Sequence, residues 1–89
     1  MNERHWDRNP QRELDDVALA RGWFIRRHGD RRWRVYRHDQ VIAELGVLYS
    51  GEWWVCPEDE ALPWAQTYRS AAQAVEALVA WWQVTRPFD

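Results

Sequence analysis

The sequence contains no lysine, only one cysteine and no long apolar run. The last two features each exclude a class of structure. A single cysteine, Cys56, cannot form a disulfide within the chain. No apolar segment approaches the roughly 20 residues that cross a bilayer, and the charged segment 1–10 lacks the apolar core of a signal peptide. We therefore expect a cytoplasmic protein that does not associate with membranes.

Motifs that carry chemistry are also missing. The soft metal ligands are three histidines and Cys56, and no CxxC or HxxxH spacing connects them, so we expect no metal site. No histidine is placed to activate Cys56, and the acids at 58–60 are typical of a solvated loop. The four glycines match neither a phosphate loop nor a dinucleotide fingerprint. The sequence predicts no catalytic residues, no cofactor and no enzymatic activity.

The chain is instead rich in tryptophan and in segregated charge. Eight of its 89 residues are tryptophan, and a chain this short forms one small domain that needs large side chains for its core. The stretch 21–38 holds seven arginines and one acid, a net charge of +6. The stretch 39–62 holds six acids and no base, a net charge of −6. Fields of this kind steer binding partners more than they specify a fold.

Two segments are expected at the start of the chain. Residues 1–9 show no apolar periodicity, so we expect a flexible arm, followed by a single domain over 10–89. Asn9 and Pro10 suit the cap and first position of a helix that ends near Arg21, before a glycine.

Four apolar-alternating runs follow, separated by turn residues at 28–30, 38–40 and 50–51, which predict an antiparallel β-meander. Ser70 and Gln73 then form a capping box for a second helix that ends near residue 87. The expected fold class is α+β: an N-terminal helix, a four-stranded antiparallel meander, and a C-terminal helix packed on the sheet.

Strand register can be predicted by placing apolar residues on one face. This places Arg27 opposite Arg31 in the first hairpin, Arg34 opposite Glu44 in the second, and Leu45 opposite an inward-facing Cys56 in the third. The reverse face then carries Phe24, Arg26, Arg32, Arg34, Tyr36, Ile42, Glu44, Leu48, Trp53 and Val55.

That reverse face is too aromatic and too rich in arginine for an ordinary solvated surface. One interpretation is that the first helix, or the arm through Trp6, covers part of it. The other is a binding surface, because arginine and aromatic side chains dominate interface hot spots. The candidate binding residues are Phe24, Arg26, Arg32, Arg34, Tyr36 and His38.

Two kinds of partner suit such a face. We expect a non-enzymatic interaction module that binds a protein with an acidic patch, or a protein and nucleic-acid assembly. The alternative is direct nucleic-acid binding, since bases stack on rings and guanidinium groups. The sequence isoelectric point of about 5.9 favours the protein partner.

The predicted order of elements resembles arm-type and AP2-like DNA-binding domains, and a double-stranded-RNA-binding fold with an added strand. The resemblance implies nucleic-acid binding and assigns no residue roles. In size, polarised charge and lack of catalytic groups the chain is also similar to small phage-encoded inhibitors such as anti-CRISPR proteins. That resemblance implies a phage or mobile-element inhibitor that acts by binding a protein.

Adjacent tryptophans in the second helix raise the question of self-association. Trp81 and Trp82 point about 100° apart on a helix, so both cannot lie at the centre of one apolar stripe. Either the first helix packs beside this flank, or a second copy does so in a homodimer through Ala74, Ala77 and Trp81.

Overall fold

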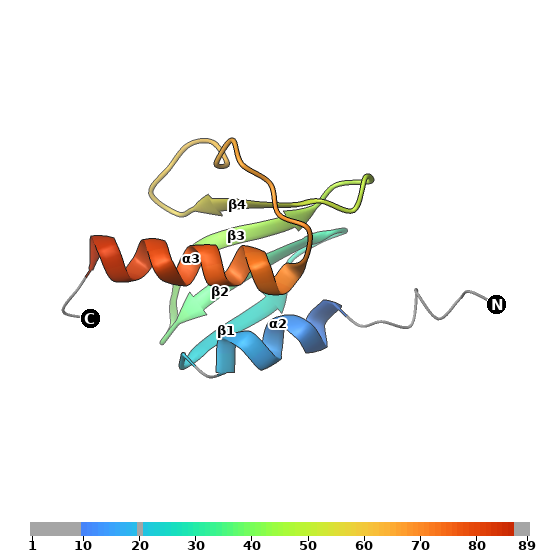
Figure 1. The fold of residues 1–89 in the computed structure, drawn as a ribbon. Coiled ribbons are helices and arrows are strands. Elements are labelled where there is room, and N and C mark those ends of the chain that lie inside the picture. The colour runs from blue at the N-terminus through green and yellow to red at the C-terminus, as the bar shows by residue number, and fades with distance from the viewer. Residues whose placement is uncertain (1–9, 20, 87–89) are drawn as a thin grey trace.

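The computed structural model describes residues 10–19 and 21–86, so the predicted arm lies outside the described residues. The elements, in chain order, are α2 (Pro10–Leu19), β1 (Trp23–Arg27), β2 (Arg32–Arg37), β3 (Gln40–Val47), β4 (Trp53–Pro57) and α3 (Ala71–Thr85). The strands form one antiparallel sheet in the order β1-β2-β3-β4 (Figure 1). The predicted fold class is confirmed. Among the described residues, no helix has the length and apolar character to cross a membrane.

Both helices lie on one face of the sheet. In Figure 1, α3 runs across the sheet while α2 lies beside β1. Leu14 and Ala18 of α2 are buried in the same cluster as Val75 and Leu78 of α3. The interpretation that the first helix covers part of the reverse face is therefore wrong, because its apolar stripe packs against α3 and β1. The alternative, cover by the arm through Trp6, lies outside the described residues.

Side chains of α2 tie it to the rest of the core. Gln11 accepts a hydrogen bond from the indole Nε1 of Trp33 at 3.1 Å and donates to the Ile25 carbonyl at 2.5 Å. Glu13 accepts from the backbone N–H of Ala72 at 3.2 Å, which satisfies one free donor in the first turn of α3. Side chains of α2 thus form hydrogen bonds with both the sheet and α3.

The predicted capping box begins α3. Ser70 Oγ accepts from the Gln73 N–H at 3.1 Å, and Gln73 Oε1 accepts from the Arg69 N–H at 3.2 Å. The helix ends at Thr85, after which the Arg86 N–H donates to the Trp82 carbonyl at 2.8 Å.

The first hairpin keeps the predicted faces but not the predicted register. Arg27 lies opposite Trp33, two residues away from its predicted partner Arg31. The reason is that Arg31 belongs to the turn, in a left-handed conformation with φ of 63°. Its guanidinium donates to the carbonyls of Val47 at 3.0 Å and Leu48 at 2.5 Å, which joins this turn to the end of β3.

The second hairpin contains a β-bulge. Arg34 lies opposite Glu44 as predicted, but the register shifts after Val35, so Tyr36 lies opposite Val41. The extra residue, Ile42, is 5% exposed and belongs to the core cluster. Its predicted place on the reverse face is therefore wrong, because a bulge breaks the strict alternation of faces.

The third hairpin is shifted by one residue from the prediction. Leu45 lies opposite Val55 and Gly46 opposite Trp54, because the connection is a longer loop in which the Leu48 N–H donates to the Glu52 carbonyl at 2.8 Å. A one-residue shift exchanges the two faces of a strand. The predicted outward positions of Trp53 and Val55, and the inward position of Cys56, are therefore wrong: Trp53 and Val55 are core residues.

Both tryptophans at the end of α3 have neighbours within the chain. The Trp81 ring lies 6.0 Å from Trp64, and the Trp82 ring lies 6.0 Å from Trp23, in edge-to-face contacts. Ala74 is fully buried, so it cannot contact a second copy. The homodimer stays a prediction, with Ala77 and Trp81 as the partly exposed members of its predicted surface.

Candidate functional site

The face of the sheet opposite the helices, here called the outer face, is the candidate site. Its strands alternate, so every second side chain of β1 and β2 projects onto it. Its described residues are Phe24, Arg26, Arg32, Arg34, Tyr36, Glu44, Gly46, Trp54 and Cys56. Neither helix covers this face (Figure 1).

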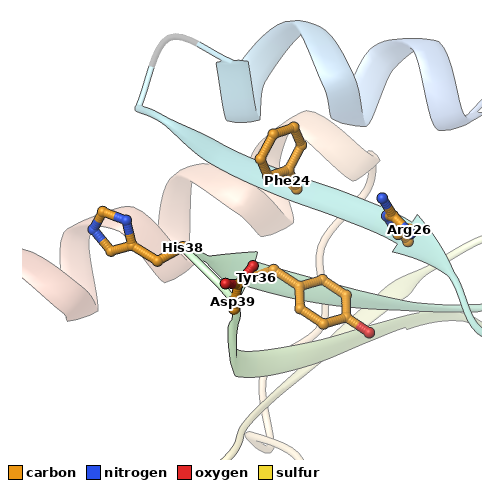
Figure 2. A pocket seen from close by; sticks show the side chains of 5 residues that line it. All are labelled: Phe24, Arg26, Tyr36, His38 and Asp39. Atoms are coloured by element: carbon orange, nitrogen blue, oxygen red, sulfur yellow. The ribbon is translucent and has the colours of Figure 1, made fainter.

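A hollow of about 250 Å³ lies on the outer face near the turn between β2 and β3. Figure 2 shows Phe24 and Arg26 on β1, Tyr36 on β2, and His38 and Asp39 at the turn. Four of the six predicted binding residues therefore line one hollow. Phe24 is 59% exposed, which is a large apolar area for a residue within a strand.

Local backbone structure positions these groups. Phe24 lies opposite Tyr36, so the two rings share one cross-strand position, and Arg26 follows two residues along the same strand. His38 has a left-handed φ of 59°, which allows the chain to turn within two residues before Gln40 pairs with Arg37. The bulge in β3 adjoins this turn.

The other two predicted binding residues, Arg32 and Arg34, are engaged with an acid. Arg32 Nη2 lies 3.0 Å from one Glu44 carboxylate oxygen, and Arg34 Nε lies 3.5 Å from the other. Glu44 is thus held between two guanidinium groups across the β2 and β3 pair. These interactions neutralise part of the positive charge that the sequence places on this face.

Arg26 differs from those two arginines. No ion pair or hydrogen bond of its guanidinium group occurs among residues 10–19 and 21–86. It is exposed beside Phe24 and Tyr36 in the hollow. The hollow therefore combines two aromatic rings with a cation whose donors are available to a ligand.

Trp54 is a third aromatic residue of this face that the sequence analysis missed. A Cβ atom at Gly46 would lie 2.1 Å from the Trp54 indole, so the ring packs directly on the β3 backbone. An isolated glycine within a strand often marks such a close approach. The glycine at position 46 was therefore the feature of the sequence from which Trp54 could have been predicted on the outer face.

Cys56 lies near Glu58 and Glu60, which follow β4 and form what we call the acidic end of the outer face. Burial, and then the charges of Glu44, Glu60 and Glu58, raise the pKa of its thiol above the ordinary value. A thiol with a raised pKa stays protonated at neutral pH and is a poor nucleophile. Within the described ranges, no cluster of three or more histidine, cysteine or acidic residues could hold a metal ion.

No protein-family model matches the chain, and neither curated proteins nor solved structures give a match. No residue of this sheet can therefore be assigned a role by comparison with a relative. Function must be argued from the site itself, because one fold supports many functions.

Proposed function

We propose that this chain is a non-enzymatic interaction module that binds a partner protein through the outer face of its sheet. The observation that carries the proposal is the hollow, which lies on a face that neither helix covers. It holds two aromatic rings and a guanidinium group that has no ion pair within the described part of the chain. Arginine and tyrosine are among the residues that contribute most to protein interfaces.

The physical gain would come mainly from Phe24 and Tyr36. Burying about 100 Å² of the exposed Phe24 ring would contribute roughly 2.5 kcal/mol at about 25 cal/mol per Å². A carboxylate of the partner could pair with Arg26 in a charge-assisted, bidentate geometry. An acidic patch with one apolar anchor is therefore the surface that fits this hollow best.

The face of the sheet suits docking better than the edge at β4. The backbone N–H and carbonyl of Trp53 pair with Tyr68 at 2.8 and 2.9 Å, and the Trp64 N–H donates to the Val55 carbonyl at 2.8 Å. These bonds occupy the edge that an added strand would need.

Direct nucleic-acid binding is less well supported by the same face. A phosphate would compete with Glu44 for Arg32 and Arg34, and the acidic end around Cys56 would repel it. Absence of binding to random single-stranded oligonucleotides in about 50 mM salt would reject this alternative. The narrower hypothesis of a phage inhibitor of the anti-CRISPR style stays a prediction.

The test compares two double variants that change charge and apolar area equally. The first, Phe24→Ser with Arg26→Glu, alters the hollow; the control, Leu19→Ser with Arg69→Glu, alters exposed residues elsewhere. A partner captured from the native host by the wild-type protein is identified and purified, and its Kd is measured with all three proteins.

We expect the first variant to weaken binding by about 100-fold, since two hot-spot contacts are lost, and the control by less than about threefold. Circular dichroism melts should show that both variants remain folded. Equal affinity of the hollow variant and the wild type would overturn the proposal.

A further inference from the structure

Three arginines from distant parts of the chain gather around Trp82 near the C-terminal end of α3. Arg86 lies with its guanidinium carbon 4.3 Å from the Trp82 ring centroid, and that of Arg37 lies 5.6 Å from it. Arg21, which follows α2, lines a hollow with Arg37 and Trp82. We call Arg21, Arg37 and Arg86 the arginine cluster.

No ion pair within residues 10–19 and 21–86 balances the charges of the arginine cluster. In the described part of the chain, the salt bridges involve Arg27, Arg32 and Arg34, and none involves the cluster. A guanidinium group that stacks on a ring keeps its N–H donors in its own plane, where they can bind an anion. Arg86 uses one such donor, at 3.3 Å, to the Thr85 hydroxyl.

Cation–π contact and the negative end of the helix dipole account for an arginine at this position. They do not account for Arg21, which lines a hollow with Arg37 and Trp82. The like charges of Arg21 and Arg37 repel each other across this hollow, and an anion between them would relieve that repulsion.

Two hollows of about 190 Å³ each border Arg37 and Trp82. The first is lined, among the described residues, by Arg21, Arg37, Trp23, Trp82, Val79 and Gln83, none of which is an acid. The second includes Arg86 together with the exposed carboxylates Glu58 and Asp59. An anion is therefore favoured in the first hollow, between Arg21 and Arg37, while Arg86 lies over the Trp82 ring and borders the second hollow.

We propose that the arginine cluster binds a phosphate group. Two guanidinium forks match the tetrahedral oxygens of phosphate, and a third positive charge nearby suits its second negative charge. The site is separate from the hollow on the outer face. Arg37 contacts Trp82 on the helix side of the sheet, whereas the adjacent Tyr36 lines the outer hollow.

The test titrates inorganic phosphate at constant ionic strength, with chloride as the balancing ion. The wild type is compared with Arg37→Gln, with Arg21→Gln, and with Arg69→Gln as a control at the opposite end of α3. For a Kd of about 1 mM, 10 mM phosphate should raise the Tm by roughly 5 to 10 °C. The indole N–H signal of Trp82 in two-dimensional NMR should move with the same Kd.

Each variant is compared with its own phosphate-free state, so a change in basal stability does not affect the readout. We expect Arg37→Gln and Arg21→Gln to lose most of the phosphate-induced shift, and Arg69→Gln to keep it. The same shift in all four proteins, or no shift in the wild type, would overturn the proposal.

Two further probes distinguish the source of the phosphate. Adenosine monophosphate that binds more tightly than inorganic phosphate would indicate a small organic phosphate. A short single-stranded oligonucleotide that binds more tightly still, with affinity that falls steeply with salt, would indicate a nucleic-acid backbone. Undiminished binding of adenosine monophosphate to Arg37→Gln would contradict the assigned site.

Discussion

The two faces of this sheet carry aromatic residues from the same strands, yet these residues have different roles. On the helix side, Trp23, Trp33 and Trp53 are almost fully buried. On the outer face, Phe24 is exposed, and Tyr36 and Trp54 are partly exposed. The comparison shows that aromatic content does not by itself mark a core, because the elements packed against each face decide which rings lose contact with water.

The strongest test of this difference replaces two adjacent tryptophans. Trp53→Ala should lower the free energy of unfolding by about 3 to 5 kcal/mol, because it leaves a cavity against Trp33, whose ring lies 5.1 Å away. Trp54→Ala removes a ring that packs on one side only and should cost about 1 to 2 kcal/mol. Urea denaturation measures both, and equal losses would mean that the faces do not differ as described.

A smaller effect is expected from the polar contact that joins α2 to the buried face. Gln11→Leu removes the acceptor of the Trp33 indole N–H and should lower the free energy of unfolding by about 1 to 3 kcal/mol. Arg12→Leu, at the exposed neighbouring position, is the control and should change it by less than about 0.5 kcal/mol. The same denaturation experiment decides, and a neutral Gln11→Leu would show that this contact contributes nothing.

On the outer face, Glu44→Gln should have a modest effect on stability and a clearer effect on binding. Losing the partner of Arg32 and Arg34 should cost about 1 kcal/mol or less, because both arginines are partly exposed. The freed charges should also raise affinity for single-stranded oligonucleotides, measured by fluorescence anisotropy. Asp30→Asn, which removes the exposed partner of Arg27, is the matched control and should change neither quantity measurably.

The smallest expected effect is on pH dependence. The raised pKa of Cys56 means that the folded state holds this proton more tightly than the unfolded state does. Its contribution to stability is therefore full below the ordinary value of 9.0 and is lost as pH rises through the folded pKa. Thermal melts from pH 8 to 11 should show a slightly smaller decline for Cys56→Ser than for the wild type. A steeper decline would contradict the direction of the shift.

The order of the elements could be predicted because caps and alternation are local signals. Ser70 and Gln73 predicted the start of α3, and opposite charges placed Arg34 across from Glu44. The last hairpin could not be predicted in the same way. Trp53 and Trp54 are adjacent and alike, so a one-residue shift leaves an aromatic residue on each face, and the loop length decides between them.

Part of the candidate site could also be predicted from the alternation of side chains along the strands. Phe24, Arg26 and Tyr36 lie on two strands whose faces survive a two-residue shift in register. Ile42 was predicted on the wrong face, because the bulge that turns it into the core is set by tertiary packing. Such a bulge leaves little trace in the alternation of side chains. Arg21 and Trp82 line one hollow although they are 61 residues apart in the sequence, which no local pattern reveals.

We propose that the outer face, and not the helix side, contacts a partner protein. It can be tested by placing a photo-crosslinking phenylalanine analogue at position 24, and in a matched protein at the exposed Val84 of α3, and irradiating both in the native host. We expect a discrete crosslinked protein from position 24 that is absent from position 84. A crosslink from position 84 alone, or the same products from both positions, would contradict it.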